Sequence, residues 1–431
     1  MQKIAFYTLG CKVNQYETEV MAEKFADAGY SIVDFGENAD IYIVNTCSVT
    51  AVAERKSRNA IYRAHRLNPG ALIAVTGCYS QVNAKDIEKI GFVDIIIGNS
   101  EKGDIVSIVE NFGSDAVTYV SDIMQCRSYN ELKTNAHRGK TRAFMKIEDG
   151  CDNYCAYCII PYARGHVRSR LPDDIIKEAE AFVAAGYKEI VLTGIHLTSY
   201  GKDLDNIDLS DILLRLHEVE GLERMRLGSL ELTPVLEKIA DMSERLPRLC
   251  PHFHISLQSG CDNTLAAMRR RYTCADYESA VKKLKSKWEN AAVTTDIMVG
   301  FPGETADDFA DSEKFAEKIG FAKIHVFPYS VRPGTRAADM TPQVPENIKK
   351  QRAAEMQRTA DECEKAFLEA QKGRVLSVLI EQKSGDCWKG HSENYMPVEV
   401  KSDIDIKKQI ADVEITDIKD GILYGRLVRV K

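Results

Sequence analysis

Two stretches of the sequence alternate short apolar runs with amphipathic segments, and this alternation restricts the fold more than any other feature. In the first, from residue 3 to about 100, the runs KIAFYT, ADIYIVN, ALIAVTG and VDIIIG are separated by helix-like segments. Continuous apolar runs of this length are typical of strands buried on both faces, and the segments between them are long enough to cross over as helices. The N-terminal part is therefore predicted to be a doubly wound parallel sheet of the α/β class.

A second alternation extends from residue 142 to about 330. Its strand candidates are AFMKIED, KEIVLTG, RMRLGSL, FHISLQ, VTTDIMVG and KIHVFPY. These six β/α units predict a partial barrel, because eight are needed for closure with this topology. A long polar helix is expected from about residue 346 to 372. The short strands after residue 373, with Gly and Asp at their turns, predict a small antiparallel β-barrel.

The length of the chain also requires more than one domain. Domains usually contain about 100 to 200 residues, and this chain has 431. A polar stretch from residue 112 to 139 follows neither periodicity and is predicted to be a linker. The expected domains are residues 1–112, 137–368 and 371–431.

Composition narrows the class of protein. With 44% hydrophobic and 28% charged residues, the chain is expected to fold as a soluble protein. Its net charge of −7 repels phosphate weakly, so a nucleic acid would have to bind at local basic patches. The start MQKIAFYTLGCKVNQYE is neither a signal peptide nor a membrane span, so we expect a cytoplasmic protein without membrane contact. In a reducing cytosol, its twelve cysteines would be buried, metal-bound or catalytic.

The strongest local signal is the segment GCDNYCAYC, which places Cys151, Cys155 and Cys158 on one short loop after a predicted barrel strand. Three thiolates can hold three irons of a cubane cluster and leave the fourth iron open to a small molecule. The alternatives are a structural zinc site or incidental thiols, but zinc normally has four ligands. The loop therefore predicts an iron–sulfur site that carries out chemistry.

Three other cysteines share a different context. Cys11, Cys47 and Cys78 each follow an apolar run, in TLGC, NTC and TGC. The carboxyl ends of parallel strands lie at one edge of a sheet, where such sheets bind their ligands. A single cysteine after a buried strand usually serves packing, but three in the same context predict a second three-thiolate site. The other six cysteines show no ligand spacing.

The cysteine loop at the mouth of a β/α barrel resembles the radical S-adenosylmethionine superfamily, whose members bind the methionine amino and carboxylate groups at the open iron. Together with TLGCKVNQYE, NTCSVT, TGCYSQ, LTGIHLTSYG, HISLQSGCDNTLAAMRRRYT and DIMVGFPGET, it resembles the methylthiotransferase family over nearly the whole chain. Members join an N-terminal cluster domain, a radical S-adenosylmethionine barrel and a substrate-binding β-barrel called TRAM. TLGCKVNQYE is similar to the branch that modifies threonylcarbamoyl-adenosine next to the tRNA anticodon.

The resemblance implies two 4Fe-4S clusters and S-adenosylmethionine as cofactors. The cluster that reductively cleaves S-adenosylmethionine to a 5'-deoxyadenosyl radical would be held by Cys151, Cys155 and Cys158. The auxiliary cluster, which supplies sulfur, would be held by Cys11, Cys47 and Cys78. Carbon 2 of adenine carries an unactivated C–H bond that no side-chain base can deprotonate, so a cofactor-derived radical is needed. A second S-adenosylmethionine would provide the methyl group, and no catalytic side chain beyond the cluster ligands is expected.

Six further barrel residues are expected to bind S-adenosylmethionine: Tyr157, Gly194, Ser229, Glu231, Gln258 and Gly300. Tyr157 would touch the adenine, although an aromatic ring could equally serve packing here. Gly194 begins the segment that resembles the receiver of the methionine amino group. Glu231 suits ribose hydroxyls, and its alternative is a solvated acid at a helix start. Gly300 would let the backbone approach the adenine or would simply form a tight turn.

Basic clusters flank the cysteines and suit a tRNA that presents phosphates on both sides of the reactive base. The expected tRNA contacts are Arg55, Arg58, Arg164, Arg168, Arg170, Arg426 and Arg429. The first pair lies on a predicted helix and has a solvated helix face as its alternative. For the three arginines after the barrel cysteines, the alternatives are binding the S-adenosylmethionine carboxylate or closing a domain interface. The last pair alternates along YGRLVRVK and could project from one strand face.

The predicted function is a tRNA methylthiotransferase that converts threonylcarbamoyl-adenosine to its 2-methylthio derivative. Two alternatives keep the chemistry but act on isopentenyl-adenosine tRNA or on a ribosomal-protein aspartate. A non-enzymatic alternative is a metal-stabilised tRNA-binding scaffold, colourless with zinc, whereas two cubane clusters predict a brown protein with about eight irons per chain. The expected partners are tRNA and a reduced flavodoxin or ferredoxin-like electron donor, and we expect a monomer.

Overall fold

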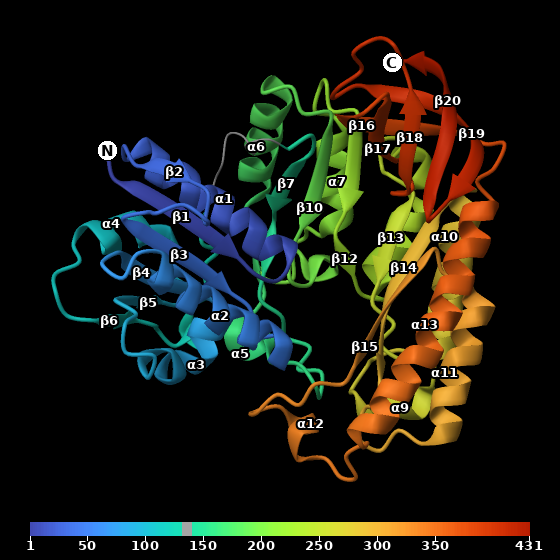
Figure 1. The fold of residues 1–431 in the computed structure, drawn as a ribbon. Helices are drawn as coiled ribbons and strands as arrows, with labels where there is room; N and C mark the ends of the chain where they lie inside the picture. Colours follow the sequence, from blue (N-terminus) through green and yellow to red (C-terminus); the bar gives the residue numbers. More distant parts are fainter. Residues whose placement is uncertain (132–139) are drawn as a thin grey trace.

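The computed structural model of the protein describes residues 1–131 and 140–431. It contains three units in chain order: a parallel sheet, a larger layer of strands and helices, and a small β-barrel (Figure 1). The expected start of the second domain at residue 137 and the last part of the predicted linker lie outside the described residues. Within the described ranges, none of the helices has the length and apolarity needed to cross a membrane.

The N-terminal unit is a parallel sheet with strand order β2-β1-β3-β4-β5-β6, which confirms the predicted doubly wound fold. Its elements are β1 (Lys3–Thr8), α1 (Lys12–Asp27), β2 (Ser31–Val33), β3 (Ile41–Thr46), α2 (Ala51–Leu67), β4 (Leu72–Gly77), α3 (Cys78–Glu88), β5 (Ile95–Ile97), α4 (Ile105–Glu110) and β6 (Val117–Tyr119). Strands β2 and β6 have three residues each and are too short to leave a periodic signal. Because β6 pairs with β5, the sheet extends into the stretch predicted to be a linker, and that prediction is corrected there.

Helices cover both faces of this sheet. On strand β3, Ile43 packs in a buried cluster with Met21 of α1 and Val109 of α4. The next residue, Val44, belongs to the cluster on the opposite face, with Ile61 of α2. Successive strand residues point to opposite faces, so one buried strand serves both layers. The strand order reverses between β1 and β3, and sheets of this kind bind ligands in the crevice at the carboxyl ends of such strands.

The central unit has parallel strands in the order β7-β10-β11, continued by β12-β13-β14-β15. Strand β11 runs into β12 across Gly228, and a parallel bridge joins Met225 to Leu249, so all six predicted strand segments form one open layer. The strands are β7 (Ala143–Lys146), β8 (Glu148–Asp149), β9 (Arg168–Ser169), β10 (Glu189–Thr193), β11 (Arg224–Leu227), β12 (Ser229–Leu230), β13 (His252–Ile255), β14 (Ala292–Val299) and β15 (Lys323–Pro328). The predicted partial barrel is confirmed.

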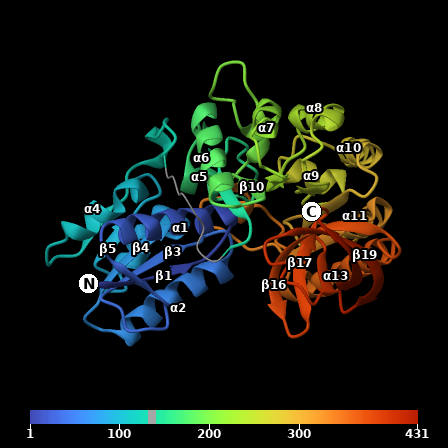
Figure 2. The ribbon, with the colours of Figure 1, turned by 90° about the horizontal axis from the view of Figure 1, so that it is seen from above.

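The helices of this unit form an arc outside the strands, as Figure 2 shows for α6, α7, α8 and α10. They are α5 (Ile160–Arg164), α6 (Pro172–Ala184), α7 (Leu209–His217), α8 (Pro234–Asp241), α9 (Asp262–Ala267), α10 (Cys274–Lys287), α11 (Ala306–Ile319), α12 (Arg336–Asp339) and α13 (Glu346–Glu369). Helix α11 begins with a capping box, in which Thr305 and Asp308 each accept a hydrogen bond from the other's backbone N–H.

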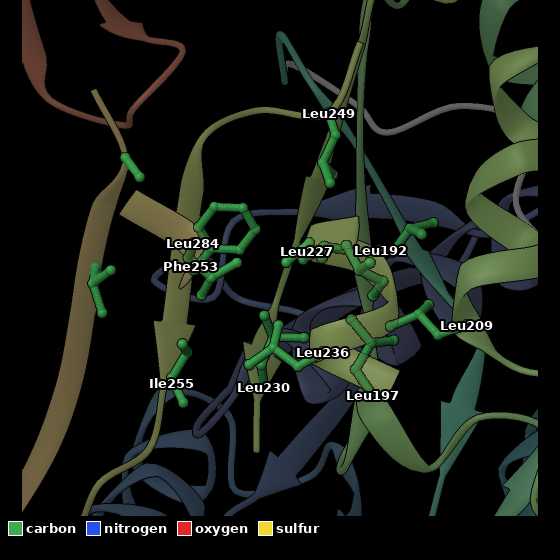
Figure 3. Packing of buried hydrophobic residues seen from close by; sticks show 14 of the residues in the cluster. Leu192, Leu197, Leu209, Leu227, Leu230, Leu236, Leu249, Phe253, Ile255 and Leu284 are labelled. Carbon is green, nitrogen blue, oxygen red and sulfur yellow. The ribbon is translucent and has the colours of Figure 1, made fainter. Parts of the chain in front are cut away.

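The largest apolar core lies between these helices and the strands. Leu192 of β10, Leu227 of β11 and Phe253 of β13 are fully or almost fully buried in it, facing Leu209 and Leu236 from the helices (Figure 3). Burying a side chain of this kind contributes roughly 1.5–3 kcal/mol relative to leaving it exposed. This core fixes the strands, so the residues at their carboxyl ends project from a rigid edge.

The C-terminal unit is a closed five-stranded barrel with the order β16-β17-β18-β20-β19. Its strands are β16 (Val375–Ser384), β17 (Cys387–Ser392), β18 (Pro397–Lys401), β19 (Ile410–Lys419) and β20 (Ile422–Val430). The pairing is antiparallel except between β18 and β20, which is parallel, as in the Greek-key barrels of the OB type. Strand β17 has only a weak signal in the sequence, because Gly390 interrupts its apolar alternation. A Cβ there would lie 2.1 Å from the carbonyl oxygen of Leu379.

Candidate active site

The first cysteine set lies on a loop at the carboxyl edge of the central strands. The chain leaves β8 through Gly150, and the loop carries Cys151, Cys155 and Cys158 before helix α5 begins. Gly150 has a φ of 84°, and a Cβ at this position would lie 1.9 Å from the carbonyl oxygen of His166. Only glycine permits this close turn, so the cysteine spacing is presented on a constrained backbone.

A cavity of about 150 Å³ opens at the three thiols. The chain lines it from the loop and from the ends of β10, β12 and β13. Four of the residues predicted to bind S-adenosylmethionine lie in its wall: Tyr157, Ser229, Glu231 and Gln258. A second cavity of about 340 Å³ shares Cys155 and Glu231 with the first. The structure thus brings the cysteine loop and most of the expected cofactor residues together.

Two nitrogen-bearing side chains that the sequence did not single out, His196 and Arg270, lie against Glu231. His196 Nε2 lies 3.0 Å from Glu231 Oε2, and Arg270 forms an ion pair with the same carboxylate. Burial alone would raise the pKa of Glu231, but the hydrogen bond from His196 and the charge of Arg270 lower the pKa to about 2. Glu231 is therefore a fixed anion in the cavity wall rather than a solvated acid at a helix start.

His196 and Arg270 also contact the cysteine loop. His196 Nδ1 is 3.9 Å from Cys151 Sγ, and Arg270 Nη1 is 3.4 Å from Cys155 Sγ. The sequence did contain a signal for both, since His196 lies in LTGIHLTSYG and Arg270 in the run MRRRYT. Neither could be chosen from the sequence, because only the fold shows which of several basic residues faces the loop.

The site fits an iron–sulfur cluster and its ligand. Burial raises the pKa of the Cys158 thiol to about 12, so its thiolate form needs the positive charge of a metal. The Oε1 atom of Gln258 is buried in the described structure without a hydrogen-bond partner, at a position that also lines the cavity. Buried polar atoms are normally paired, so this one suits a bound ligand. No three His, Cys, Asp or Glu side chains in residues 1–131 and 140–431 are placed to hold a single metal ion.

Two predicted cofactor residues lie away from the wall of this cavity. A Cβ at Gly194 would be 2.5 Å from Glu148 Oε2, and one at Gly300 would be 2.4 Å from Lys349 Cγ. Gly300 also has a φ of 72° and donates its N–H to Glu304 at 2.9 Å. Both glycines therefore permit close packing of the chain itself, and for Gly300 the structure favours the tight-turn alternative.

The second cysteine set gathers at the carboxyl edge of the N-terminal sheet. Cys11 follows β1, Cys47 follows β3 and Cys78 begins α3 directly after β4. A Cβ on Gly10 would lie 3.1 Å from Cys47 Sγ, so the first two segments touch. Burial, reinforced by the neighbouring Cys78, raises the pKa of Cys47 to about 12. The three strands thus deliver their cysteines to the crevice that this strand order creates.

Arg164 connects the two cysteine sets. It lies at the end of helix α5, which follows the barrel loop, and its Nε is 3.4 Å from Cys78 Sγ. The same guanidinium pairs with the buried carboxylates of Glu17 in α1 and Asp149 in β8. Arg164 is completely buried, so it joins two units of the protein rather than meeting a phosphate.

The expected tRNA contacts of the neighbouring arginines are corrected in the same way. Arg168 is 3% exposed and lies near Asp149, while Arg170 is fully buried and pairs with Glu178 and Glu131. Of the alternatives considered for these residues, closure of a domain interface describes Arg164 best. The sequence showed that these arginines are positively charged, but it did not show which acidic side chains form ion pairs with them in the folded protein.

The other expected tRNA contacts are on the surface or partly so. Arg55 is exposed on α2, and Arg58 on the same helix donates to the hydroxyl of Tyr79 at 3.1 Å. Arg426 and Arg429 project from β20, where they pair with Glu414 and Asp412 of β19. All four side chains are at least partly exposed, so a tRNA phosphate could reach them, although Arg426 and Arg429 already form ion pairs within the C-terminal barrel.

A further cavity of about 170 Å³ lies between the segment that follows Cys47 and the barrel loop. Val49 and Thr50, just after Cys47, line it together with Tyr157 and Cys158 of the barrel loop. The backbone N–H of Ala51 donates to Ser330 Oγ at 3.1 Å, which ties the start of α2 to the barrel. A molecule in this space would touch both units at once.

An open β/α barrel with a three-cysteine loop at its carboxyl edge defines the chain as a radical S-adenosylmethionine enzyme. The model of the Radical SAM superfamily matches residues 145–316, and that of the Uncharacterized protein family UPF0004 matches residues 3–98. The fold is similar to that of the radical S-adenosylmethionine methyltransferase TsrM from Kitasatospora setae, with cobalamin and a [4Fe-4S] cluster bound. The TM-score is 0.58 at 16% identity, covering 78% of this chain and 77% of that one.

Curated relatives narrow the class further. The threonylcarbamoyladenosine tRNA methylthiotransferase MtaB of Bacillus subtilis is 40% identical, covering 100% of this chain and 97% of its own. A tRNA-2-methylthio-N(6)-dimethylallyladenosine synthase of Oceanobacillus iheyensis is 33% identical, covering 99% of this chain and 84% of its own. The chain belongs to the tRNA methylthiotransferase family of radical S-adenosylmethionine enzymes. Membership implies S-adenosylmethionine and a [4Fe-4S] cluster as cofactors.

Proposed function

We propose that the protein converts threonylcarbamoyl-adenosine next to the tRNA anticodon to its 2-methylthio derivative, using S-adenosylmethionine and two 4Fe-4S clusters. The observation that carries this proposal is that the two units that hold the cysteine sets meet, through the contact of Arg164 with Cys78 and through the cavity lined by Thr50 and Cys158. A base placed there could receive both the radical chemistry of one set and the sulfur of the other. The 40% identity to a threonylcarbamoyladenosine enzyme supports the choice of substrate.

In this proposal each residue of the site has a separate task. The barrel cluster is held by Cys151, Cys155 and Cys158, and the auxiliary cluster by Cys11, Cys47 and Cys78. When bound, the barrel cluster and S-adenosylmethionine supply a radical able to abstract hydrogen from an unactivated carbon. Glu231, held by His196 and Arg270, would accept hydrogen bonds from the ribose of S-adenosylmethionine, and the unpaired Gln258 Oε1 would accept one more.

The proposed partners follow from the substrate. tRNA would contact Arg55 and Arg58 beside the auxiliary cysteines, and Arg426 and Arg429 on the C-terminal barrel, through its phosphates. A reduced flavodoxin or ferredoxin-like protein would donate electrons to a monomeric enzyme. Both partners place the proposed reaction in the cytoplasm.

A second candidate substrate is dimethylallyl-adenosine in tRNA, which is favoured by the 33% identity to the synthase from Oceanobacillus. Nucleoside mass spectrometry of tRNA from a deletion strain separates the two. We expect the 2-methylthio form of threonylcarbamoyl-adenosine to disappear and to return with the intact gene but not with a Cys155→Ala gene. If only the 2-methylthio form of dimethylallyl-adenosine disappears, the substrate is dimethylallyl-adenosine and not threonylcarbamoyl-adenosine. Peptide mass spectrometry of ribosomal proteins tests the aspartate alternative in the same strain.

The scaffold alternative is tested on the purified protein. Anaerobic preparation should give a brown protein with about eight irons per chain if both clusters are cubanes. A colourless protein containing zinc would refute the proposed enzyme and favour the tRNA-binding scaffold.

A further inference from the structure

A cluster of cations surrounds the first turn of α1, directly after Cys11. The Lys12 ammonium lies 5.5 Å from the ring centre of Phe144 in β7 and 5.5 Å from that of Tyr395 in the β17–β18 turn. The guanidinium groups of Arg142 and Arg226 lie 5.4 and 4.6 Å from the same Tyr395 ring. The N-terminal sheet, the central barrel and the C-terminal barrel therefore meet at one group of positive charges.

Lys12 differs from the two arginines in having no acid of its own. Arg142 Nε donates to Glu189 Oε1 at 3.1 Å, and Arg226 Nε donates to the same oxygen at 2.9 Å. In the part of the chain that the structure describes, neither a hydrogen bond nor an ion pair satisfies the Lys12 ammonium. The side chain is nevertheless partly buried and faces both guanidiniums. A cation in such surroundings is costly unless an anion from outside the chain completes the site.

The rings of Phe144 and Tyr395 hold the ammonium without neutralising it. Attraction between a cation and an aromatic face fixes the position of the charge but leaves its hydrogen-bond donors free. Lys140, which lies 4.8 Å from the centre of the same Phe144 ring, is different, because it forms an ion pair with Glu19. The Lys12 ammonium is thus held in position and can still bind an anion.

We infer that Lys12 binds the carboxylate of the threonylcarbamoyl group and so selects the substrate; this inference rests on the proposed function. The threonylcarbamoyl substituent ends in a carboxylate, whereas a dimethylallyl substituent is an uncharged hydrocarbon. Both are attached to the six-membered ring that contains carbon 2. In the proposed function Cys11, the neighbour of Lys12 in the chain, holds the auxiliary cluster that supplies sulfur, so the lysine and a ligand of that cluster are adjacent residues. A carboxylate held by an ammonium in a partly buried site gives a strong charge-assisted contact.

An RNA phosphate is the other anion that this lysine could meet. The two are distinguished with two anticodon stem-loop RNAs of the same sequence, one carrying threonylcarbamoyl-adenosine and the other its neutral threonine amide. Binding is measured by fluorescence anisotropy with the full-length protein, and methylthiolation is measured with the anaerobically reconstituted enzyme. We expect the wild-type protein to prefer the acid RNA over the amide RNA by about tenfold in both Kd and kcat/KM.

The decisive variant is Lys12→Gln. We expect it to lose the preference through weaker binding of the acid RNA, while its Kd for the amide RNA and its iron content stay at the wild-type values. In the matched control, Lys140→Gln, the preference for the acid RNA should persist. Equal losses on both RNAs would overturn the inference in favour of a phosphate contact or a role in folding. A wild-type enzyme that converts both RNAs equally would also overturn it but would leave the proposed function standing, whereas conversion of neither RNA would refute the proposed function itself.

Discussion

The barrel cysteines and the N-terminal cysteines show two different ways in which a chain assembles three thiols. The barrel set occupies eight consecutive residues on one loop, between Gly150 and helix α5. The N-terminal set is drawn from the ends of β1, β3 and β4, and its members are separated by 36 and 31 residues in the sequence. The first arrangement is largely a property of a local backbone, while the second exists only when the parallel strands pair in register.

This difference predicts that a structural disturbance will affect the geometry of the two cysteine sets differently. A disturbance of the N-terminal sheet should scatter Cys11, Cys47 and Cys78 without altering the barrel loop. The barrel loop, in contrast, is backed by the largest apolar core and should keep its shape. Arg164 is the exception, since it follows the loop in sequence and contacts Cys78 in space.

The largest effect is expected from Cys155→Ala. In the proposed mechanism this change removes a ligand of the cluster that cleaves S-adenosylmethionine, so both cleavage and sulfur insertion should be lost. The measurement is 5'-deoxyadenosine formation by the anaerobically reconstituted enzyme, with iron content expected to fall by about half. Retained 5'-deoxyadenosine formation would show that Cys155 is not a ligand.

Cys47→Ala should remove the activity that depends on the N-terminal cysteine set and leave the activity of the barrel set. The barrel loop is intact in this variant, so 5'-deoxyadenosine formation should remain within about twofold of wild type, while methylthio product disappears. Both products are quantified in the same reaction by mass spectrometry. Equal loss of both would indicate that Cys47 supports the fold, because its side chain is buried beside Gly10 and its backbone N–H donates to Ser57 Oγ.

Arg164→Ala tests the connection between the sets. The change leaves Glu17 and Asp149 buried with fewer partners, and breaking a buried ion pair costs about 3–5 kcal/mol. We expect a marked decrease in the free energy of unfolding, measured by urea denaturation, and uncoupling of product formation from S-adenosylmethionine cleavage. The exposed Arg55→Ala is the matched control and should change stability by less than about 0.5 kcal/mol. A stability like that of the control would mean that Arg164 is not needed to join the two units.

The sequence predicts features that are local in the chain, and it does not predict contacts between elements that are far apart in it. The strands of both parallel layers were visible because buried strands are continuous apolar runs, and the cysteine loop was visible as a spacing. The ion network around Glu17 was not, because Lys102 and Lys146 become its partners only when distant elements meet. For the same reason the arginines after the cysteine loop were expected at the surface, although their acidic partners lie in α1, β8 and α6.

The smallest effect concerns two buried carboxyl groups with opposite pKa shifts. Burial raises the pKa of Glu148, beneath the barrel loop, to about 8. At the interface, burial alone would raise the pKa of Glu17, but Arg164, Lys102 and Lys146 hold it well below its ordinary value. A raised pKa in the folded state means that the stability from Glu148 is full below about pH 4.5 and is lost as the pH rises toward 8. Glu17 has the opposite effect. Its lowered pKa stabilises the folded protein above the ordinary pKa of a glutamate, and this contribution is lost only as the pH falls below that value.

Glu148→Gln should therefore flatten the pH dependence of stability. The amide keeps an oxygen to accept the backbone N–H of His196, which is 2.7 Å from the carboxylate in the wild type, but it cannot ionise. Relative to wild type, the variant should become more stable by about 1–3 kcal/mol between pH 5 and 8, as measured by urea denaturation of matched anaerobic samples. Glu17→Gln should show no such gain over this range, because its wild-type carboxylate is already charged throughout. Parallel pH profiles for Glu148→Gln and wild type would show that Glu148 ionises normally, and the contrast between the two carboxyl groups would then be lost.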